Sequence, residues 1–208
     1  MPTAPDFMSR DPLAPGFWDE RFEKRFTPWD RGGVAEDLRR FIAGSAKPLT
    51  VAKQPPAVLL PGCGSAYELL LMCEAGWDAT AIDFSPVAVA RARELAGPWA
   101  GRIVEADFFT YQPPRPLDAV IEQAFLCALP RVRWPEVARR WEQLLAPGGL
   151  LAGYFYFDDA PKGPPFGIAR AQLDALLTPG FECIVDGAVA DSIPVFAGKE
   201  RWMVWRRR

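Results

Sequence analysis

The most constraining feature of this 208-residue sequence is a regular alternation of short apolar runs with longer amphipathic segments. The apolar runs predict buried strands, and the helical spacing of apolar residues between them predicts helices. Strands that alternate with helices form a mostly parallel sheet with helices on both faces, which is an α/β fold. The expected strands are Ala57–Leu60, Ala79–Ile82, Arg102–Glu105, Ala119–Gln123, Leu150–Phe157, Phe181–Asp186 and Trp202–Trp205.

The helices are placed by their start and stop signals. Ser85 followed by Pro86 opens a helix, because serine caps the first turn and proline is well tolerated there. The segment APGG after Leu145 ends another helix. Between the third and fourth strands, FFTYQPPRPL has too many prolines for a helix, so this crossover is expected to be a loop. The expected helices lie within 16–33 and at 34–44, Tyr67–Glu74, from Pro86 onward, Trp134–Leu145 and Ile168–Leu177.

Composition and charge argue against several function classes. The formal net charge is −2, so no global field draws the chain to nucleic acid or to an anionic membrane. No apolar run approaches the ~20 residues of a membrane span, and the start MPTAPDFMSRD lacks the pattern of a signal peptide. The chain has no histidine, and its four cysteines are scattered without a C-x-x-C pair. We therefore expect no zinc site and a reduced, cytoplasmic protein. We also expect a monomer.

The segment PGCGSA, at residues 61–66, follows the first expected strand. Ligands of open parallel sheets bind at the carboxyl ends of the strands, where such a turn lies. Gly62 and Gly64 let the backbone approach a ligand that a Cβ would push away. Asp83, at the end of the next strand, lies at about the spacing (~20 residues) of a carboxylate that accepts both hydroxyls of a ribose.

The turn is incomplete as a dinucleotide motif. Position 67 is Tyr rather than the third glycine of G-x-G-x-x-G, so a pyrophosphate, and with it NAD, is disfavoured. S-adenosylmethionine, a nucleoside without phosphate, fits better. The alternative is a tight strand-to-helix turn with a surface aspartate. At the end of the third strand, Asp107 is suited to accept from an adenine amino group and Phe108 to pack on the ring; the alternative is a helix cap and a core phenylalanine.

The chain resembles the thiopurine/thiol S-methyltransferase family, which includes plant thiol and halide methyltransferases. The matching pieces, in family order, are FWDERFEKRFTPWDRGG, LLPGCGSAYELL, AIDFSPVAVARA, ADFF, EQAFLCALP and GPPF. The resemblance implies a class I S-adenosylmethionine-dependent methyltransferase. Its fold would be a Rossmann-like, doubly wound, mostly parallel seven-stranded sheet with an antiparallel last strand, plus an N-terminal helical lid. We expect one domain over residues 1–208, with the lid and helices at 1–45 and the core at 56–208.

The resemblance also assigns roles to single residues. For S-adenosylmethionine these are Trp18 and Trp29 from the lid, Gly62 at the amino-acid part, Asp83 at the ribose, and Asp107 and Phe108 at the adenine. Tryptophan faces suit a sulfonium cation because the ring attracts positive charge. Gln123 and Glu122, at the end of the fourth strand, would lie near the methyl group. A small-molecule acceptor would be lined by Phe22, Trp29, Phe125 and Phe166.

Three departures leave the acceptor open. Residue 123 is Gln, where animal thiopurine enzymes have Arg and plant halide enzymes have Tyr. Phe22 stands where the plant enzymes have a third Trp, and Ala66 replaces the usual last glycine of the turn. The segment GPPF is similar to the N/D-P-P-Y/F motif of adenine N6 methyltransferases. It follows the fifth expected strand rather than the fourth and starts with Gly163, so we expect no nucleic-acid target.

The residues that are missing suggest a mechanism. A thiolate, selenolate or halide is already a nucleophile, whereas an alcohol or amine needs a base or metal. The chain has no histidine and no acidic cluster with metal spacing. We therefore predict direct in-line methyl transfer to a small thiolate, thiopurine-like, chalcogen or halide acceptor, without a metal. Cys127 is interpreted as a buried filler. Two alternatives stay open: a small-molecule O- or N-methyltransferase, and a non-catalytic S-adenosylmethionine-binding module.

Overall fold

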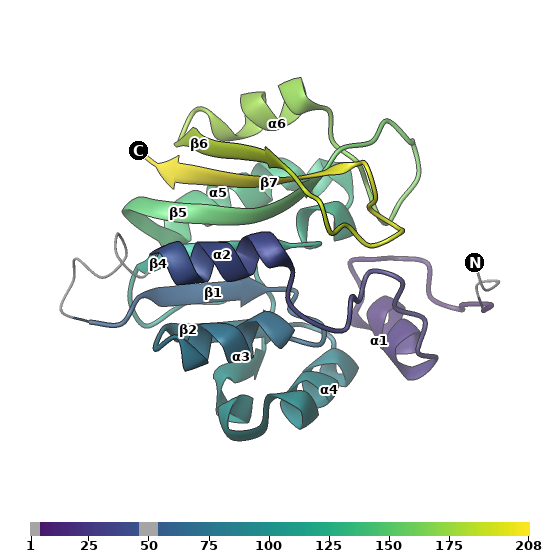
Figure 1. Ribbon diagram of the computed structural model, residues 1–208. Coiled ribbons are helices and arrows are strands. Elements are labelled where there is room, and N and C mark those ends of the chain that lie inside the picture. Colours follow the sequence, from purple (N-terminus) through teal and green to yellow (C-terminus); the bar gives the residue numbers. More distant parts are fainter. Residues whose placement is uncertain (1–4, 46–53) are drawn as a thin grey trace.

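A seven-stranded sheet organises the computed structural model, which describes residues 5–45 and 54–208 (Figure 1). The strands lie in the order β3-β2-β1-β4-β5-β7-β6. Their bounds are β1 Ala57–Pro61, β2 Asp78–Asp83, β3 Ile103–Glu105, β4 Leu117–Gln123, β5 Leu145–Tyr156, β6 Phe181–Ala188 and β7 Glu200–Arg207. The chain runs outward from β1 in both directions, so the predicted α/β, doubly wound arrangement is confirmed.

The direction of the last strand departs from that of the others. Strands β1 to β5 are parallel to one another. Strand β7 lies between β5 and β6 and is antiparallel to both, with Tyr154 opposite Trp202 and Cys183 opposite Trp205. The antiparallel last strand predicted from the family resemblance is therefore confirmed.

Helices cover both faces of the sheet. They are α1 Pro15–Glu23, α2 Glu36–Ser45, α3 Tyr67–Glu74, α4 Pro86–Ala96, α5 Trp134–Leu144 and α6 Arg170–Leu177. Successive residues of a strand point to opposite faces. Val58 and Leu60 of β1 accordingly belong to the core beneath α2, α3 and α4, and Ala57 and Leu59 belong to the core beneath α5 and α6.

Local sequence signals predict most of the helix and strand boundaries. Ser85 caps α4 as predicted, because its Oγ accepts from the Ala88 N–H at 3.1 Å. The crossover at residues 106–116 contains no helix, which confirms the loop. The predicted start of β5 at Leu150 is wrong. Leu145 already pairs with Leu117, and the APGG segment forms a bulge before pairing resumes at Leu150.

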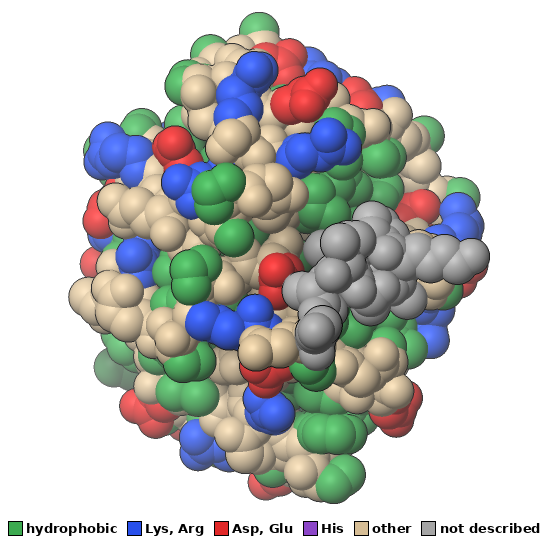
Figure 2. Space-filling view, turned by 90° about the vertical axis from the view of Figure 1, so that its left-hand side faces the viewer, with side chains coloured by type: hydrophobic (Ala, Val, Ile, Leu, Met, Phe, Trp, Pro, Cys, Tyr) green, Lys and Arg blue, Asp and Glu red, His purple; other side chains and the backbone are tan. Residues whose placement is uncertain are grey.

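The carboxyl ends of the parallel strands face α1 (Figure 1). Figure 2 shows the molecule from the opposite end, where acidic and basic side chains are interspersed, in line with the net charge of −2. No helix within the described ranges is long and apolar enough to cross a bilayer. Residues 46–53, between the N-terminal helices and the sheet, are outside the described residues, and the proline at position 48 predicts a loop there.

Candidate active site

A cavity of about 550 Å³ lies at the carboxyl ends of the strands, between the sheet and the N-terminal segment that carries α1. Its volume lies within the range of small-molecule sites (~300–1,000 Å³). The structure brings ten predicted residues together in its wall, namely Trp18, Phe22, Trp29, Gly62, Gly64, Asp83, Asp107, Phe108, Gln123 and Phe125. Two other predicted residues, Glu122 and Phe166, are not part of this wall.

The turn after β1 presents backbone to the cavity. Gly62 and Gly64 have φ values of +57° and +51°, a region that residues with side chains rarely adopt. A Cβ on Gly62 would lie 2.6 Å from Cδ2 of Phe125, closer than carbon atoms approach without displacement. Ala66, also at positive φ, keeps the turn small where a third glycine is absent. The missing side chain at Gly62 therefore lets the Phe125 ring pack directly on the turn.

Asp83 ends β2 beside this turn and is only 7% exposed. Its Oδ2 accepts from the Gly64 N–H at 3.0 Å, and its Oδ1 accepts from the Ser85 N–H at 2.9 Å. Burial raises the pKa of Asp83, and the backbone donors oppose that shift by favouring the carboxylate. Each oxygen keeps a lone pair for a further donor, so the side chain is held in place and still able to accept from a ligand.

The end of β3 contributes a polar and an aromatic residue side by side. Asp107 is exposed, and its Oδ1 accepts from the Phe109 N–H at 2.8 Å. Phe108 is buried, with its ring 4.9 Å from that of Phe125 in an edge-on contact. This pair offers an accessible acceptor next to an apolar surface.

Aromatic residues of the N-terminal segment close the cavity from the other side. The rings of Trp18 and Trp29 meet edge to face at 5.4 Å, and Phe22 lies 6.2 Å from Trp29. Helix α1 is anchored to the sheet domain because the Ser85 hydroxyl donates to Asp19 Oδ1 at 2.5 Å. The predicted lid residues therefore face the strand ends.

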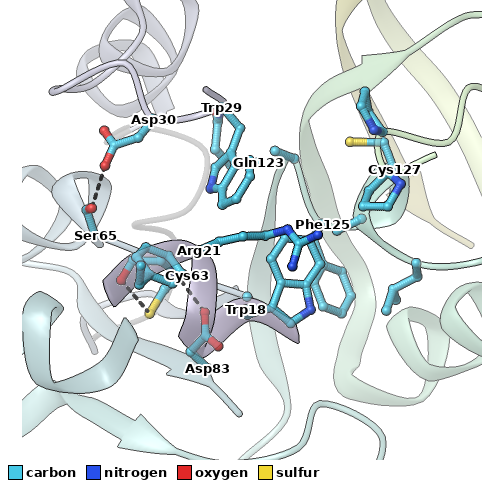
Figure 3. A pocket seen from close by; sticks show the side chains of 18 of the residues that line it. Trp18, Arg21, Trp29, Asp30, Cys63, Ser65, Asp83, Gln123, Phe125 and Cys127 are labelled. Atoms are coloured by element: carbon cyan, nitrogen blue, oxygen red, sulfur yellow. Dashed lines mark hydrogen bonds between the residues drawn. The ribbon is translucent and has the colours of Figure 1, made fainter. Parts of the chain in front are cut away.

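Arg21 of α1 also lines the cavity, and its side chain reaches across it in Figure 3. Its guanidinium lies 3.3 Å from the ring centroid of Phe17 and donates to the Phe17 carbonyl. Burial lowers the pKa of Arg21. Nothing in the sequence marks this residue, because an arginine on a charged amphipathic helix is normally a solvated side chain.

The two residues predicted near the methyl group differ in position. Gln123 lines the cavity, and its Oε1 is buried without a hydrogen-bond partner among the described residues. Glu122 is 1% exposed, and its carboxylate accepts from the N–H groups of Phe125 and Leu126. Burial raises the pKa of Glu122 to about 8. Glu122 thus stabilises the turn after β4, and Gln123 is the one that reaches the cavity.

Beyond Gln123 the wall is apolar. It contains Cys127, Val195 and Phe196, together with Pro164 and Pro165 of the loop after β5. Figure 3 shows Cys127 on the far side of Gln123 from Asp83. No motif in the sequence marks Val195 and Phe196, which come from the loop between β6 and β7.

The prolines, rather than Phe166, form the wall that the segment GPPF supplies. The Phe166 N–H donates to the Cys127 carbonyl at 2.6 Å, and its ring packs with the core beneath α5 and α6. The guanidinium of Arg131 lies 5.8 Å from the ring centroid. These contacts hold the ring outside the cavity wall.

Comparison with known proteins identifies the family. Residues 13–208 match the thiopurine S-methyltransferase family. This chain belongs to that family. It is 31% identical over 201 residues to a probable thiol methyltransferase 2 of Arabidopsis thaliana, covering 92% of this chain and 85% of the relative. It is 29% identical over 198 residues to thiocyanate methyltransferase 1 of the same plant, with the same coverage. A thiopurine S-methyltransferase of Vibrio cholerae is 28% identical over 180 residues, covering 78% and 80% of the two chains.

Solved structures agree on the fold of this methyltransferase. The Burkholderia thailandensis 1,6-didemethyltoxoflavin-N1-methyltransferase, with S-adenosylhomocysteine bound, superposes with a TM-score of 0.72 at 18% identity, covering 97% of this chain and 92% of the other. The Synechocystis magnesium protoporphyrin IX methyltransferase, with S-adenosylmethionine bound, gives 0.69 at 16% identity, covering 98% and 100%. At such identities the likeness shows the Rossmann-like fold alone. The protein is thus an S-adenosylmethionine-dependent methyltransferase of the thiol and thiopurine type, as the resemblance predicted.

The cavity of this methyltransferase also holds acidic residues that the sequence analysis did not single out. Asp30 follows Trp29 and accepts from the Ser65 hydroxyl at 2.6 Å, and Glu68 lies in the first turn of α3. Both line the cavity. Within the described ranges, no group of three or more His, Cys, Asp or Glu residues is placed to hold a metal ion.

Proposed function

We propose that this enzyme transfers a methyl group from S-adenosylmethionine to a small, soft anion, such as a thiolate, thiocyanate, a chalcogen anion or a halide, by direct displacement without a general base. The observation that carries the proposal is the contrast along the cavity wall. Carboxylates lie beside the turn after β1, whereas the wall beyond Gln123 is apolar. The names of the plant relatives, which act on thiols and on thiocyanate, support this acceptor class.

The residues present fit S-adenosylmethionine. The turn at Gly62 and Gly64 lines the same cavity as the buried Asp83 carboxylate and Gln123, whose Oε1 has no hydrogen-bond partner among the described residues. In the proposed placement, Asp83 accepts from the ribose hydroxyls, Asp107 and Phe108 hold the adenine, and Gly62 and Gly64 border the amino-acid part. Trp18 and Trp29 cover the molecule from the lid. When bound, S-adenosylmethionine supplies an electrophilic methyl group on a sulfonium sulfur.

The order of the strands supports a position for the acceptor. The proposed adenine, ribose and turn residues end β3, β2 and β1, and Gln123 ends the next strand, β4. The cavity continues past Gln123 towards Cys127, Val195 and Phe196. An acceptor there would approach the methyl group from the apolar end. The protein would contribute alignment and exclusion of water, which together accelerate a reaction between preformed reactants.

None of the described side chains at this end is suited to remove a proton. The chain contains no histidine. Burial raises the pKa of Cys127 well above its usual value, so its thiol stays protonated near neutral pH. Both carboxylate oxygens of Glu122 accept backbone N–H groups outside the cavity wall. An acceptor that arrives already ionised removes the need for a base.

The pH dependence of the reaction tests the proposal. With a series of aromatic and alkyl thiols, whose pKa values flank that of a cysteine thiol (~8.5), log kcat/KM should rise with pH up to each thiol's own pKa. The reason is that kcat/KM reports the ionisation of the free reactants, here the thiol. The inflection should move in parallel with the thiol pKa across the series.

Glu122→Gln is the matched variant, because it keeps the side-chain shape and removes the carboxylate of the residue that precedes Gln123. The proposal expects the same set of inflections in this variant. A single inflection near pH 8 shared by all thiols, and abolished by Glu122→Gln, would show that a general base operates and would overturn the mechanism.

A further inference from the structure

The cavity contains one buried acidic side chain that neither the ribose nor the adenine assignment uses. Glu68, in the first turn of α3, is only 6% exposed and lines the cavity. No hydrogen bond or ion pair from another described residue reaches its carboxylate. A carboxylate buried without a partner is costly unless it is protonated or meets a cation.

The charged neighbours of Glu68 are already engaged. Asp30 accepts from the Ser65 hydroxyl and lies 3.5 Å from the guanidinium of Arg91. Arg31 donates to the side chain of Asp191 at 2.8 Å and to its carbonyl at 3.0 Å. The charges that act on Glu68 therefore include a second acid, Asp30, and an arginine, Arg31, that already pairs with Asp191.

The electrostatics of Glu68 agree with this isolation. Its pKa is raised to about 7 because burial disfavours the carboxylate; its own backbone N–H opposes that rise, and the smaller contributions of Asp30 and Arg31 raise and lower the pKa respectively. Burial raises the pKa of the Cys63 thiol, and the charges of Asp83 and Glu68 add to that rise. The positive end of the α3 dipole, which favours a carboxylate in the first turn, does not restore the ordinary pKa. The ionised form of Glu68 would be stabilised if a positive charge entered the site.

We infer that Glu68, supported by Asp30, binds the α-ammonium group of the amino-acid part of S-adenosylmethionine. This inference rests on the proposed function. Asp83 contacts the turn at Gly64, and Glu68 lies on the helix that begins directly after the same turn. A ligand whose ribose is held by Asp83 and whose amino-acid part follows the turn carries its primary ammonium towards α3. Ammonium groups bind to carboxylate oxygens by charge-assisted hydrogen bonds.

The test compares two ligands by calorimetry: S-adenosylhomocysteine, and its analogue in which the α-amino group is replaced by hydrogen. Glu68→Gln keeps the shape of the side chain and removes its charge. We expect this variant to bind S-adenosylhomocysteine roughly 10- to 100-fold more weakly, the usual loss for a hydrogen bond to a charged group. Its affinity for the analogue should stay within about twofold of the wild type.

Glu74→Gln is the control, because Glu74 lies exposed at the other end of the same helix. It should leave both affinities unchanged. If Glu68→Gln weakened both ligands equally, or neither, the inference would be overturned, because Glu68 would then have a structural role or none. A wild-type protein that binds neither ligand would overturn the proposed function itself.

Proton release gives a second measurement that needs no variant. Glu68 must be ionised to pair with an ammonium group, and its pKa of about 7 leaves it partly protonated in the free protein. Binding of S-adenosylhomocysteine should therefore release roughly half a proton near pH 7, measured in buffers of different ionisation enthalpy. Its affinity should rise with pH from roughly 6 to 7.5. The analogue should release none; equal release with both ligands would contradict the inference.

Discussion

The two ends of the cavity are built in different ways. The end beside β1, β2 and β3 is shaped by backbone: two glycines at positive φ, and a carboxylate that accepts two backbone N–H groups. The end beyond Gln123 is shaped by side chains of Cys127, Val195 and Phe196. Groups fixed by backbone hydrogen bonds hold one geometry, whereas an apolar wall tolerates changes of shape.

This difference separates two functions in one cavity. The polar end suits a ligand that must be recognised in a single orientation, because its hydroxyl and amino groups need matching partners. The apolar end can exclude water and favour a weakly hydrated acceptor without selecting for the exact shape of that acceptor. Variants at the two ends should therefore change different measurable quantities, and the largest effect is expected at the polar end.

Replacement of Asp83 should have the largest effect. Asp83→Ala removes the proposed partner of the ribose hydroxyls, and we expect the affinity for S-adenosylhomocysteine to fall by about 1.5–3 kcal/mol, as for a hydrogen bond to a charged group. Asp78→Ala is the control, since Asp78 lies at the opposite end of the same strand, β2, and pairs with the exposed Arg102. Calorimetry should show a loss for the first variant only, and no binding of NAD to the wild type.

Two results would contradict this expectation. Unchanged product affinity in Asp83→Ala would remove the ribose assignment, and measurable binding of NAD would reverse the argument from the missing third glycine. Because Asp83 also accepts from Gly64 and Ser85, a thermal melt of each variant is needed to separate lost binding from a lost fold.

The same contrast explains what the sequence could predict. The residues of the polar end come from short sequence segments that are recognisable by their residue types: glycines in a strand-to-helix turn, and acids at strand ends. The mostly parallel sheet also followed from the alternation of elements, and the antiparallel β7 followed from the family resemblance. These features depend on neighbours in the chain, and so a single sequence shows them.

The rest of the site depends on contacts between distant segments. Phe196 reaches the cavity from the loop before β7, and nothing in its local sequence distinguishes it from an ordinary core residue. Phe166 was expected in the wall because of its motif. Its N–H instead donates a hydrogen bond to the Cys127 carbonyl, and Pro164 and Pro165 line the cavity. Glu68 resembled the usual acid in the first turn of a helix, and only its burial beside the cavity sets it apart.

A change at the apolar end should have an intermediate effect. Phe196 is 5% exposed, and its ring lies 5.6 Å from that of Tyr156. Phe196→Leu would enlarge this end while keeping it apolar. We expect kcat/KM for a bulky aromatic thiol to gain about 10-fold relative to that for a small inorganic anion, the usual scale for a change of one or two carbon atoms in an apolar pocket.

Binding of S-adenosylhomocysteine to Phe196→Leu should stay within about twofold of the wild type. Leu176→Ala, a partly buried change in the core beneath α5 and α6, serves as a control for general loosening. If Phe196→Leu altered the affinity for S-adenosylhomocysteine and left the ratio between acceptors unchanged, the division of the cavity into two ends would be wrong.

The smallest effect is expected where the two ends share a cover. Helix α1 supplies Trp18 and Phe22 to the cavity and is tied to α4 through Asp19, whose Oδ1 accepts from the Ser85 hydroxyl. Asp19→Asn should weaken this tie, with a loss of about threefold in affinity for S-adenosylhomocysteine. Glu23→Gln, at the exposed end of α1, should leave the affinity unchanged.

Hydrogen exchange shows whether the cover acts as a lid. We expect the amides of α1 to be less protected in the free protein and more protected with S-adenosylhomocysteine, because bound ligand gives the aromatic side chains a surface to pack on. Asp19→Asn should lower the protection of the free state and retain most of the gain on binding. The protection of the amides of α5, which packs on the face of the sheet opposite α2, α3 and α4, should not change. Equal protection of α1 with and without ligand would mean that α1 is a fixed wall, and that both ends of the cavity are permanently formed.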